Sequence, residues 1–220
     1  MARFAAVLFD LDGTLVDSAP DLAGTANDMR VARGLPPLPY GELRSMAGSG
    51  ARGMIGKAFG LLAGQPEYEA LRDEFHGRYE QRMLQATAVF AAIVPVLRGL
   101  SSRGVQWGIV TNKALRFADP MARALGLLPH AGVLVGGDST PHIKPHPAPL
   151  LEAARQLALP PAACVYVGDD ARDIYAGRAA GMATLAAAWG YLGPDAVIEE
   201  WGADAVLSAP DGLLQFLDLA

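Results

Sequence analysis

Short runs of consecutive apolar residues recur along the chain, separated by segments with helical spacing. The runs lie at residues 4–9, 106–110, 132–135, 164–167, 183–187 and 205–207. Their apolar character is continuous rather than alternating, which indicates strands that are covered on both faces. The pattern therefore predicts an α/β protein with a Rossmann-like core, in which helices flank both faces of a parallel sheet.

The interval between the first two predicted strands is much longer than a simple connection. About 90 residues lie there, whereas a crossover between parallel strands needs roughly a dozen. Because this interval is helical in pattern, we expect a small α-helical cap domain at residues 17–91. The α/β core domain would then comprise residues 1–16 and 92–220.

Two helices can be predicted within the insert. The segment from Ser18 to Asp21 predicts a capping box with proline in the first turn, at the start of a helix running toward Gly34. A second helix carries an apolar stripe at steps of three and four, made of Tyr68, Leu71, Phe75, Tyr79 and Met83. Stripes of this kind usually pack in a core, so we interpret these residues as core rather than ligand contacts.

Composition excludes several classes of partner. The chain has 220 residues, of which 51% are hydrophobic, and a net charge of −5 with scattered Lys and Arg. This argues against binding to nucleic acid or an anionic membrane. No apolar run reaches the ~18 residues of a membrane span, and the amino-terminal run is too short for a signal peptide. With Cys164 as the only cysteine, read as a core residue, we expect a cytoplasmic protein.

The first predicted strand ends in two acids, Asp10 and Asp12, followed by a glycine. Two carboxylates ~4 Å apart repel each other by about 1 kcal/mol in water and about 4 kcal/mol at a partly buried site. A cation must therefore lie close to them. This arrangement indicates a reaction centre rather than a solvated turn.

Polar residues at the ends of later predicted strands could complete that centre. Thr111 and Asn112 follow the second strand, and the prolines after Lys144 present its side chain stiffly before a helix. Asp169 and Asp173 follow the fourth strand and lie one helical turn apart. Because active sites of parallel sheets lie beyond the carboxyl ends of the strands, we expect these residues to meet. Carboxylate oxygens are hard ligands and imply Mg²⁺.

This order of segments, with a helical insert after the first, resembles the haloacid-dehalogenase-like hydrolase superfamily over essentially the whole chain. The opening Asp-Leu-Asp-Gly-Thr-Leu-Val-Asp-Ser, the Val-Thr-Asn-Lys segment and residues 181–191 look like the phosphoglycolate phosphatase group. Residues 107–113, together with 50–53 and 201–204, are also similar to N-acetylmuramic acid 6-phosphate phosphatases. The two groups are close relatives.

The resemblance implies a phosphatase that hydrolyses a small phosphorylated metabolite, with 2-phosphoglycolate as the first expectation. Asp10 would be the nucleophile and form an aspartyl phosphate. An aspartate is ionised at neutral pH, so it needs no activating base. Asp12 would protonate the leaving alkoxide and then accept a proton from the attacking water.

The same resemblance implies a metal and a phosphate-binding set. Mg²⁺ would be held by Asp10, the backbone carbonyl of Asp12 and Asp169, with Asp173 or Asp170 in support. The phosphoryl oxygens would be bound by Thr111, Asn112 and Lys144, of which Thr111 and Lys144 would also stabilise the transition state.

Other functions remain open from sequence. The alternatives are an N-acetylmuramic acid 6-phosphate phosphatase in cell-wall recycling, a phosphosugar mutase of the same superfamily and a receiver-like phosphate-binding module that is not an enzyme. A dehalogenase has no use for Asp12, and a receiver-like module needs neither that acid nor so long a cap. The protein would be a monomer or a homodimer.

A glycine-rich segment at residues 48–53 matches the dinucleotide-binding pattern, but no apolar strand precedes it. We therefore treat the match as accidental. The same glycines could let Arg52 approach a substrate carboxylate, which both candidate substrates carry. The histidines at positions 76, 130, 142 and 146 show no paired metal spacing and are expected at the surface or in turns.

Overall fold

The computed structural model describes residues 4–193 and 195–219, and its centre is a parallel sheet. The strand order is β5-β4-β1-β6-β7-β8. The strands are β1 (Ala6–Phe9), β4 (Gln106–Val110), β5 (Leu134–Val135), β6 (Cys164–Gly168), β7 (Ala183–Ala187) and β8 (Ala205–Leu207). Each strand falls within or beside a predicted apolar run, so the strand predictions are confirmed.

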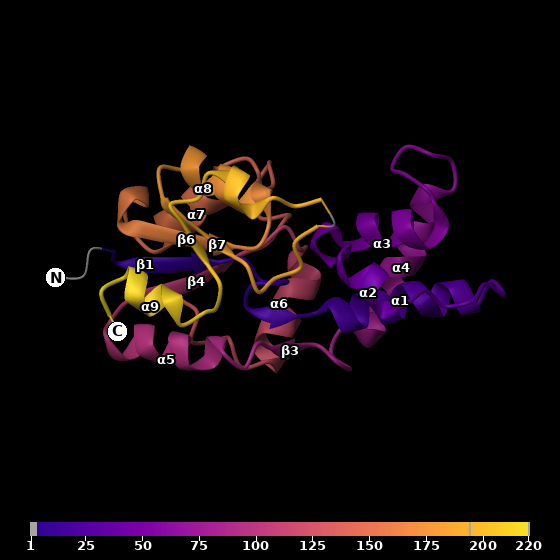
Figure 1. Cartoon of the computed structure of the whole chain (residues 1–220), viewed down its shortest axis with the longest axis horizontal. Coiled ribbons are helices and arrows are strands. Elements are labelled where there is room, and N and C mark those ends of the chain that lie inside the picture. Colours follow the sequence, from indigo (N-terminus) through magenta and orange to yellow (C-terminus); the bar gives the residue numbers. More distant parts are fainter. Residues whose placement is uncertain (1–3, 194, 220) are drawn as a thin grey trace.

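Helices cover both faces of this sheet, as Figure 1 shows. The helices α7 (Ala148–Gln156) and α8 (Ala171–Ala179) lie on one face and share a core cluster with β5 and β6. On the other face, α5 (Ile93–Ser102), α6 (Leu115–Ala124) and α9 (Gly212–Phe216) pack on β1 and β4. Short 3₁₀ turns η2 (Pro161–Ala163) and η3 (Ile198–Trp201) complete the core. The predicted fold class is confirmed.

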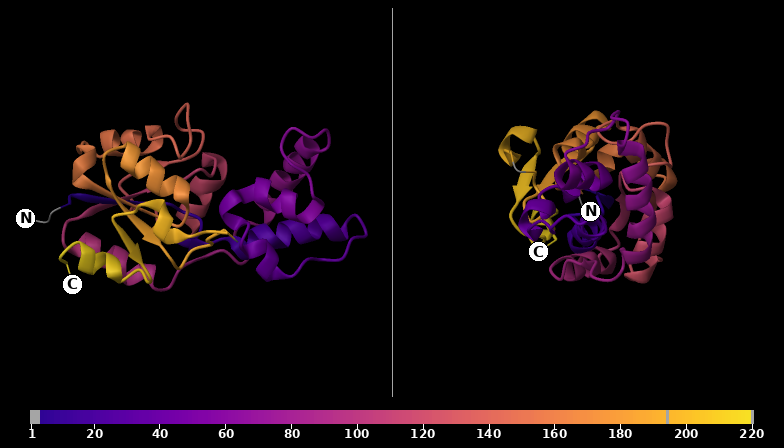
Figure 2. Two further views of the ribbon diagram at one scale, coloured as in Figure 1. Left: turned by 45° about the horizontal axis from the view of Figure 1, so that its top comes forward. Right: turned by 90° about the vertical axis from the view of Figure 1, so that its right-hand side faces the viewer.

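The long insert is helical and stands beyond one end of the sheet (Figures 1 and 2). It contains α1 (Ala19–Val31), α2 (Tyr40–Arg44), η1 (Ala47–Ser49), α3 (Gly50–Phe59) and α4 (Tyr68–Arg82). An antiparallel ribbon of β2 (Val16–Asp17) and β3 (Ala88–Val89) connects it to the core. We use "cap" for residues 17–91, a boundary that remains a prediction.

The predicted capping box at the start of α1 is wrong. The Ser18 side chain makes no capping hydrogen bond and instead donates to Asp12. The buried Asp21 accepts hydrogen bonds from the backbone of Ala86 and Thr87, at 3.0 and 2.8 Å, and from the Thr87 hydroxyl. Asp21 therefore anchors the chain returning from α4 and is not available to the start of its own helix.

Two further expectations were that Cys164 lies in the core and that the chain contains no membrane span. Cys164 is buried in β6, as expected for a core residue, and burial raises the pKa of its thiol. Over the described ranges, none of the helices combines the length and the apolar character that crossing a bilayer requires.

Candidate active site

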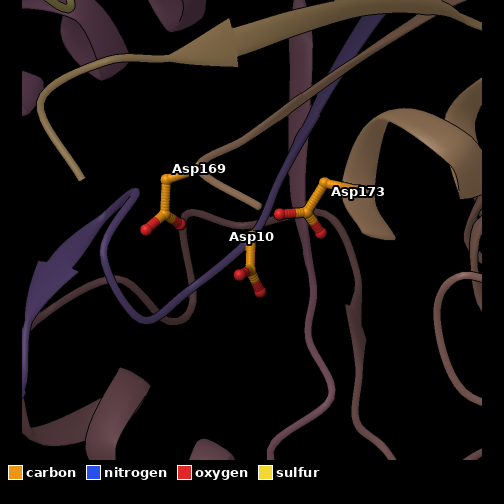
Figure 3. A group of neighbouring side chains, drawn as sticks. All are labelled: Asp10, Asp169 and Asp173. Atoms are coloured by element: carbon orange, nitrogen blue, oxygen red, sulfur yellow. The ribbon is translucent and has the colours of Figure 1, made fainter. Parts of the chain in front are cut away.

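Three acids meet at the carboxyl end of the sheet. Asp10 follows β1, Asp169 follows β6, and Asp173 lies in the first turn of α8. Figure 3 shows Asp169 and Asp173 on either side of Asp10. One carboxylate oxygen from each residue lies within 4.8 Å of the others. Sequence reasoning placed Asp10 and Asp169 together, with Asp173 or Asp170 in support, and the structure brings Asp10, Asp169 and Asp173 together.

Lys144 is the cation between these acids. Its Nζ lies 2.9 Å from Asp10 Oδ1 and 2.7 Å from Asp173 Oδ1, with only 2% of the side chain exposed. The Nζ also donates to the Val110 carbonyl at 3.1 Å. Burial alone would lower the pKa of Lys144, but the two carboxylates raise it above its ordinary value. Lys144 therefore stays charged in the interior.

Asn112 fixes the backbone from which Lys144 extends. Its Nδ2 donates to the Lys144 carbonyl at 3.0 Å, and its Oδ1 accepts from the Lys144 N–H at 2.9 Å. The neighbouring Thr111 is buried at the end of β4, and its hydroxyl accepts from the backbone N–H of Lys113 at 3.1 Å. The structure thus gives Asn112 a positioning contact, while Thr111 lines the site itself.

The acids carry more negative charge than Lys144 can balance. Burial, followed by the charges of Asp10 and Asp173, raises the pKa of Asp169 well above its usual range, although Thr14 and Tyr191 donate to it at 2.9 and 2.8 Å. Burial raises the pKa of Asp173 to about 7. A further cation bound among these carboxylates would balance the remaining charge.

The local shape also suits a metal ion. Asp10 Oδ1 is buried, and its approach to Lys144 does not have hydrogen-bond geometry, so this oxygen has no hydrogen-bond partner in the described chain. Gly13 has a φ of +85°, and a Cβ there would lie 2.2 Å from Asp169 Oδ2. A glycine is thus required beside the acids. Asp10, Asp169 and Asp173 could hold a metal through hard oxygen ligands.

Asp12 is separate from this cluster and pairs with a second lysine. Lys113 Nζ lies 2.8 and 2.9 Å from the two Asp12 oxygens, and Ser18 donates to Oδ1. Burial opposes the charge of Lys113, but Asp12 and then Tyr79 raise its pKa overall. Sequence predicted one cation beside Asp10 and Asp12. The structure has two, because Lys144 lies beside Asp10 and Lys113 beside Asp12. We assigned no role to Lys113 from sequence, because repulsion predicts a cation without saying which one.

Asp170 forms an ion pair with Arg172 at the boundary between core and cap. Arg172 Nε donates to Asp170 Oδ1 at 2.7 Å, and Nη2 donates to the Gly48 carbonyl of the cap, also at 2.7 Å. Burial opposes ionisation of Asp170, but Arg172 lowers its pKa overall. Asp170 also caps α8 in a capping box with Asp173. Of the two acids left open from sequence, Asp173 is the one that joins the three-acid cluster.

Tyr191 is a contact that sequence reasoning missed. Its backbone N–H donates to Asp169, while its hydroxyl accepts from the N–H groups of Ser18 and Ala19 at 2.6 and 3.0 Å. It therefore links Asp169 of the three-acid cluster to the first turn of α1. The Trp-Gly-Tyr segment that contains it was noted only as part of the resemblance. Its glycine, Gly190, is needed because a Cβ there would lie 2.1 Å from the Asp169 Cβ.

A cavity of about 430 Å³ lies over the acids and is lined by both the core and the cap. Its polar lining includes Asp10, Asp12, Thr111, Asn112, Lys113, Lys144 and, from the cap, Arg52. All five residues of the aromatic stripe are buried in the core, as expected, and two of them, Phe75 and Tyr79, also line the cavity. His76 lies within α4 and lines the same cavity, rather than sitting in a surface turn.

The glycine-rich segment is not a dinucleotide site. It spans η1 and the start of α3, and the element before it is the helix α2 rather than a strand. The context that the dinucleotide pattern requires is therefore absent.

Comparison with known proteins agrees with this geometry. The model of the haloacid dehalogenase-like hydrolases matches residues 4–181. The chain is 42% identical to an N-acetylmuramic acid 6-phosphate phosphatase of Pseudomonas aeruginosa, over 99% of this chain and 96% of the relative. It is 46% identical to a phosphoglycolate phosphatase of Xanthomonas campestris pv. campestris, over 94% of each.

A solved structure shares the whole architecture. The crystal structure of a predicted phosphoglycolate phosphatase from Haemophilus somnus superposes with a TM-score of 0.86 at 28% identity, covering 98% of this chain and 99% of that one. The expected resemblance and the expected class of enzyme, a phosphatase, are confirmed by these relatives. The chain belongs to the haloacid dehalogenase-like hydrolase family.

Proposed function

We propose that this protein is a Mg²⁺-dependent phosphomonoester hydrolase that works through an aspartyl phosphate on Asp10. One observation carries the proposal: Asp10 lies 2.9 Å from the buried Lys144 Nζ, within a cluster of three acids. A carboxylate attacks phosphorus without a separate base, and a fixed ammonium beside it attracts the phosphoryl group.

The remaining residues divide the work of the two half-reactions. Asp12, held by Lys113 and Ser18, would give its proton to the leaving oxygen and later take one from water. Lys144 and Thr111 would bind the phosphoryl oxygens. Asp10, Asp169 and Asp173, with the backbone carbonyl of Asp12, would hold Mg²⁺, which when bound neutralises the acids and the transferring phosphoryl group.

The first substrate we propose is 2-phosphoglycolate, a small ester with a carboxylate. Relatives bear the name of this activity, and the cap contributes Arg52 to the cavity wall. A guanidinium is well suited to bind a carboxylate.

A second substrate, N-acetylmuramic acid 6-phosphate, is favoured by the cavity itself. A space of about 430 Å³ with the aromatic residues Phe75, Tyr79 and Phe117 in its wall is roomy for a two-carbon ester. An amino-sugar phosphate would fill more of it and also carries a carboxylate. A relative from Pseudomonas aeruginosa bears this name.

The test is a panel assay of phosphate release with Mg²⁺, covering both esters, sugar phosphates, nucleotides and phenyl phosphate. We expect the largest kcat/KM for one of the two carboxylated esters. Asp10→Asn should lower kcat by at least about 10³-fold on every ester. Full activity in that variant would contradict the mechanism, and release of an isomer instead of free phosphate would identify a mutase.

The role of Arg52 is tested separately. Arg52→Ala should raise KM for the carboxylated ester by about tenfold, the effect of losing one good polar contact, and leave KM for phenyl phosphate unchanged. Lys57→Ala is the control, because Lys57 is on the same helix but pairs with Glu42 outside the cavity. Equal effects of Arg52→Ala on both esters would refute the assignment.

A further inference from the structure

Tyr79 carries a buried hydroxyl whose proton finds no acceptor in the described chain, because the charged group that interacts with it, the Lys113 ammonium, can only donate. The residue lies in α4 of the cap, is 3% exposed, lines the cavity and has no hydrogen-bond partner for its hydroxyl. Burying a hydroxyl without a partner is unfavourable. Because the cavity is adjacent, a bound molecule can supply the missing acceptor.

The position of Tyr79 identifies which part of a bound ester it would meet. Lys113 Nζ lies 5.0 Å from the centre of the Tyr79 ring, and the same Nζ lies 2.8 Å from Asp12. Asp12 is the proposed proton donor to the leaving oxygen. Tyr79 therefore lies on the alcohol side of the ester, away from the three acids that surround the phosphoryl group.

The wall beside Tyr79 has mixed apolar and cationic character. The Phe117 ring of α6 lies 5.6 Å from the Tyr79 ring and 5.6 Å from the His76 ring, and the Arg116 guanidinium lies 4.5 Å from the Phe117 ring centre. All of these residues line the cavity. Such a wall suits an alcohol group that carries oxygen acceptors and negative charge beside its carbon skeleton.

We propose that the Tyr79 hydroxyl donates a hydrogen bond to an oxygen of the substrate's alcohol group, close to the scissile ester. This makes Tyr79 a specificity-determining residue that selects phosphate esters of hydroxy acids or polyols over simple aryl phosphates. The inference rests on the proposed phosphomonoesterase function. Burial raises the pKa of Tyr79 to about 12, so the hydroxyl keeps its proton at neutral pH.

The test compares two substrates in Tyr79→Phe. For the best carboxylated ester of the panel, kcat/KM should fall about tenfold, the effect of one hydrogen bond. For phenyl phosphate, whose alcohol group has no oxygen acceptor beyond the ester, kcat/KM should stay within about twofold. The melting temperature should change by no more than a few degrees, because the variant keeps the ring beside Lys113 and the hydroxyl proton has no acceptor to lose. Tyr68→Phe is the control, since Tyr68 is buried on the same helix but does not line the cavity.

The outcomes separate this inference from the function on which it rests. If wild-type protein hydrolyses both esters and Tyr79→Phe leaves their ratio unchanged, the inference is overturned and the phosphatase function stands. An equal loss on both esters would mean a general effect on the site and would also overturn it. If wild-type protein releases no phosphate from any ester, both proposals fail.

Discussion

Polar groups at the edge of the sheet and in the cap wall differ in their protein neighbours. The acids at the edge lie beside lysines, whereas a buried hydroxyl in the cap wall has no acceptor for its proton in the part of the chain that the structure describes. At the edge of the sheet, Lys144 lies between Asp10 and Asp173, and Lys113 faces Asp12, so lysines of fixed position already lie beside the proposed catalytic acids. In the cap wall, the Tyr79 hydroxyl is buried without an acceptor for its proton among the described residues. Preorganised charge serves a reaction that is the same for every ester. A donor left for the ligand would serve selection, as we propose for Tyr79, because it would distinguish one ester from another.

The strongest test of preorganised charge is removal of the buried ammonium. Lys144→Met should lower kcat by about 10³-fold or more and the free energy of unfolding by about 3–5 kcal/mol, because it leaves the buried Asp173 and the largely buried Asp10 without their cation. Activity assays and chemical denaturation measure the two effects. Lys57→Met removes an exposed ion pair with Glu42 and should change stability by less than about 1 kcal/mol. Similar losses in both variants would mean that burial of the ion pair does not matter.

A smaller effect is expected from the second lysine. Lys113→Met leaves Asp12 with Ser18 but without its cation, and the position of the proton donor is then less defined. We expect kcat to fall about 10²-fold while KM changes little, since proton transfer rather than binding is affected. Steady-state kinetics on phenyl phosphate would show this. A rise in KM at constant kcat would instead place Lys113 among the substrate-binding groups.

Tyr191 connects the edge of the sheet to the start of the cap, and its hydroxyl contacts can be removed by substitution. Tyr191→Phe keeps the backbone donor to Asp169 but leaves the N–H groups of Ser18 and Ala19 without the hydroxyl. Loss of a buried acceptor should lower stability by about 1–3 kcal/mol, with a few-fold fall in kcat. Denaturation and kinetics check this, with the exposed Tyr175→Phe as control. Unchanged stability would show that water replaces the hydroxyl at no cost.

The smallest effect expected is a pH dependence of stability without metal. Burial raises the pKa of Asp173 to about 7 in the folded protein. The folded state therefore binds more protons than the unfolded state from about pH 4 to 7, so stability should fall as pH rises through this window and level off above it.

This pH effect can be isolated with a variant. In chelator, the melting temperature of wild-type protein should drop between pH 5 and pH 8 by a few degrees more than that of Asp173→Asn. Added Mg²⁺ should reduce the difference in wild-type protein, because a cation compensates the same charge. Parallel pH curves for the two proteins would contradict the assignment.

The sheet and the acids at its edge could be predicted from sequence because their signals are local. A strand covered on both faces is continuously apolar, and parallel strands bring their carboxyl ends together. These two rules predict that Asp10, Thr111 and Asp169, each at the end of a strand, lie at the same edge of the sheet. The fold class and the three-acid cluster needed no knowledge of long-range packing.

The contacts that could not be predicted join residues far apart in the chain. Nothing in the local sequence pairs Lys113 with Asp12 or Tyr191 with Ser18. Tyr79 poses a different problem, because a helix face that borders a cavity is as apolar as one that borders a core. The Ser18 hydroxyl could bond either to the backbone at the start of α1 or to the Asp12 carboxylate. In the structure it donates to Asp12.

Tyr191 carries one further consequence. Its backbone holds Asp169 while its hydroxyl holds the first turn of α1. Any swing of that turn away from the sheet must either break both hydroxyl contacts or drag the donor that orients Asp169. A displacement of the first turn of α1 would therefore be transmitted through Tyr191 to the orientation of Asp169.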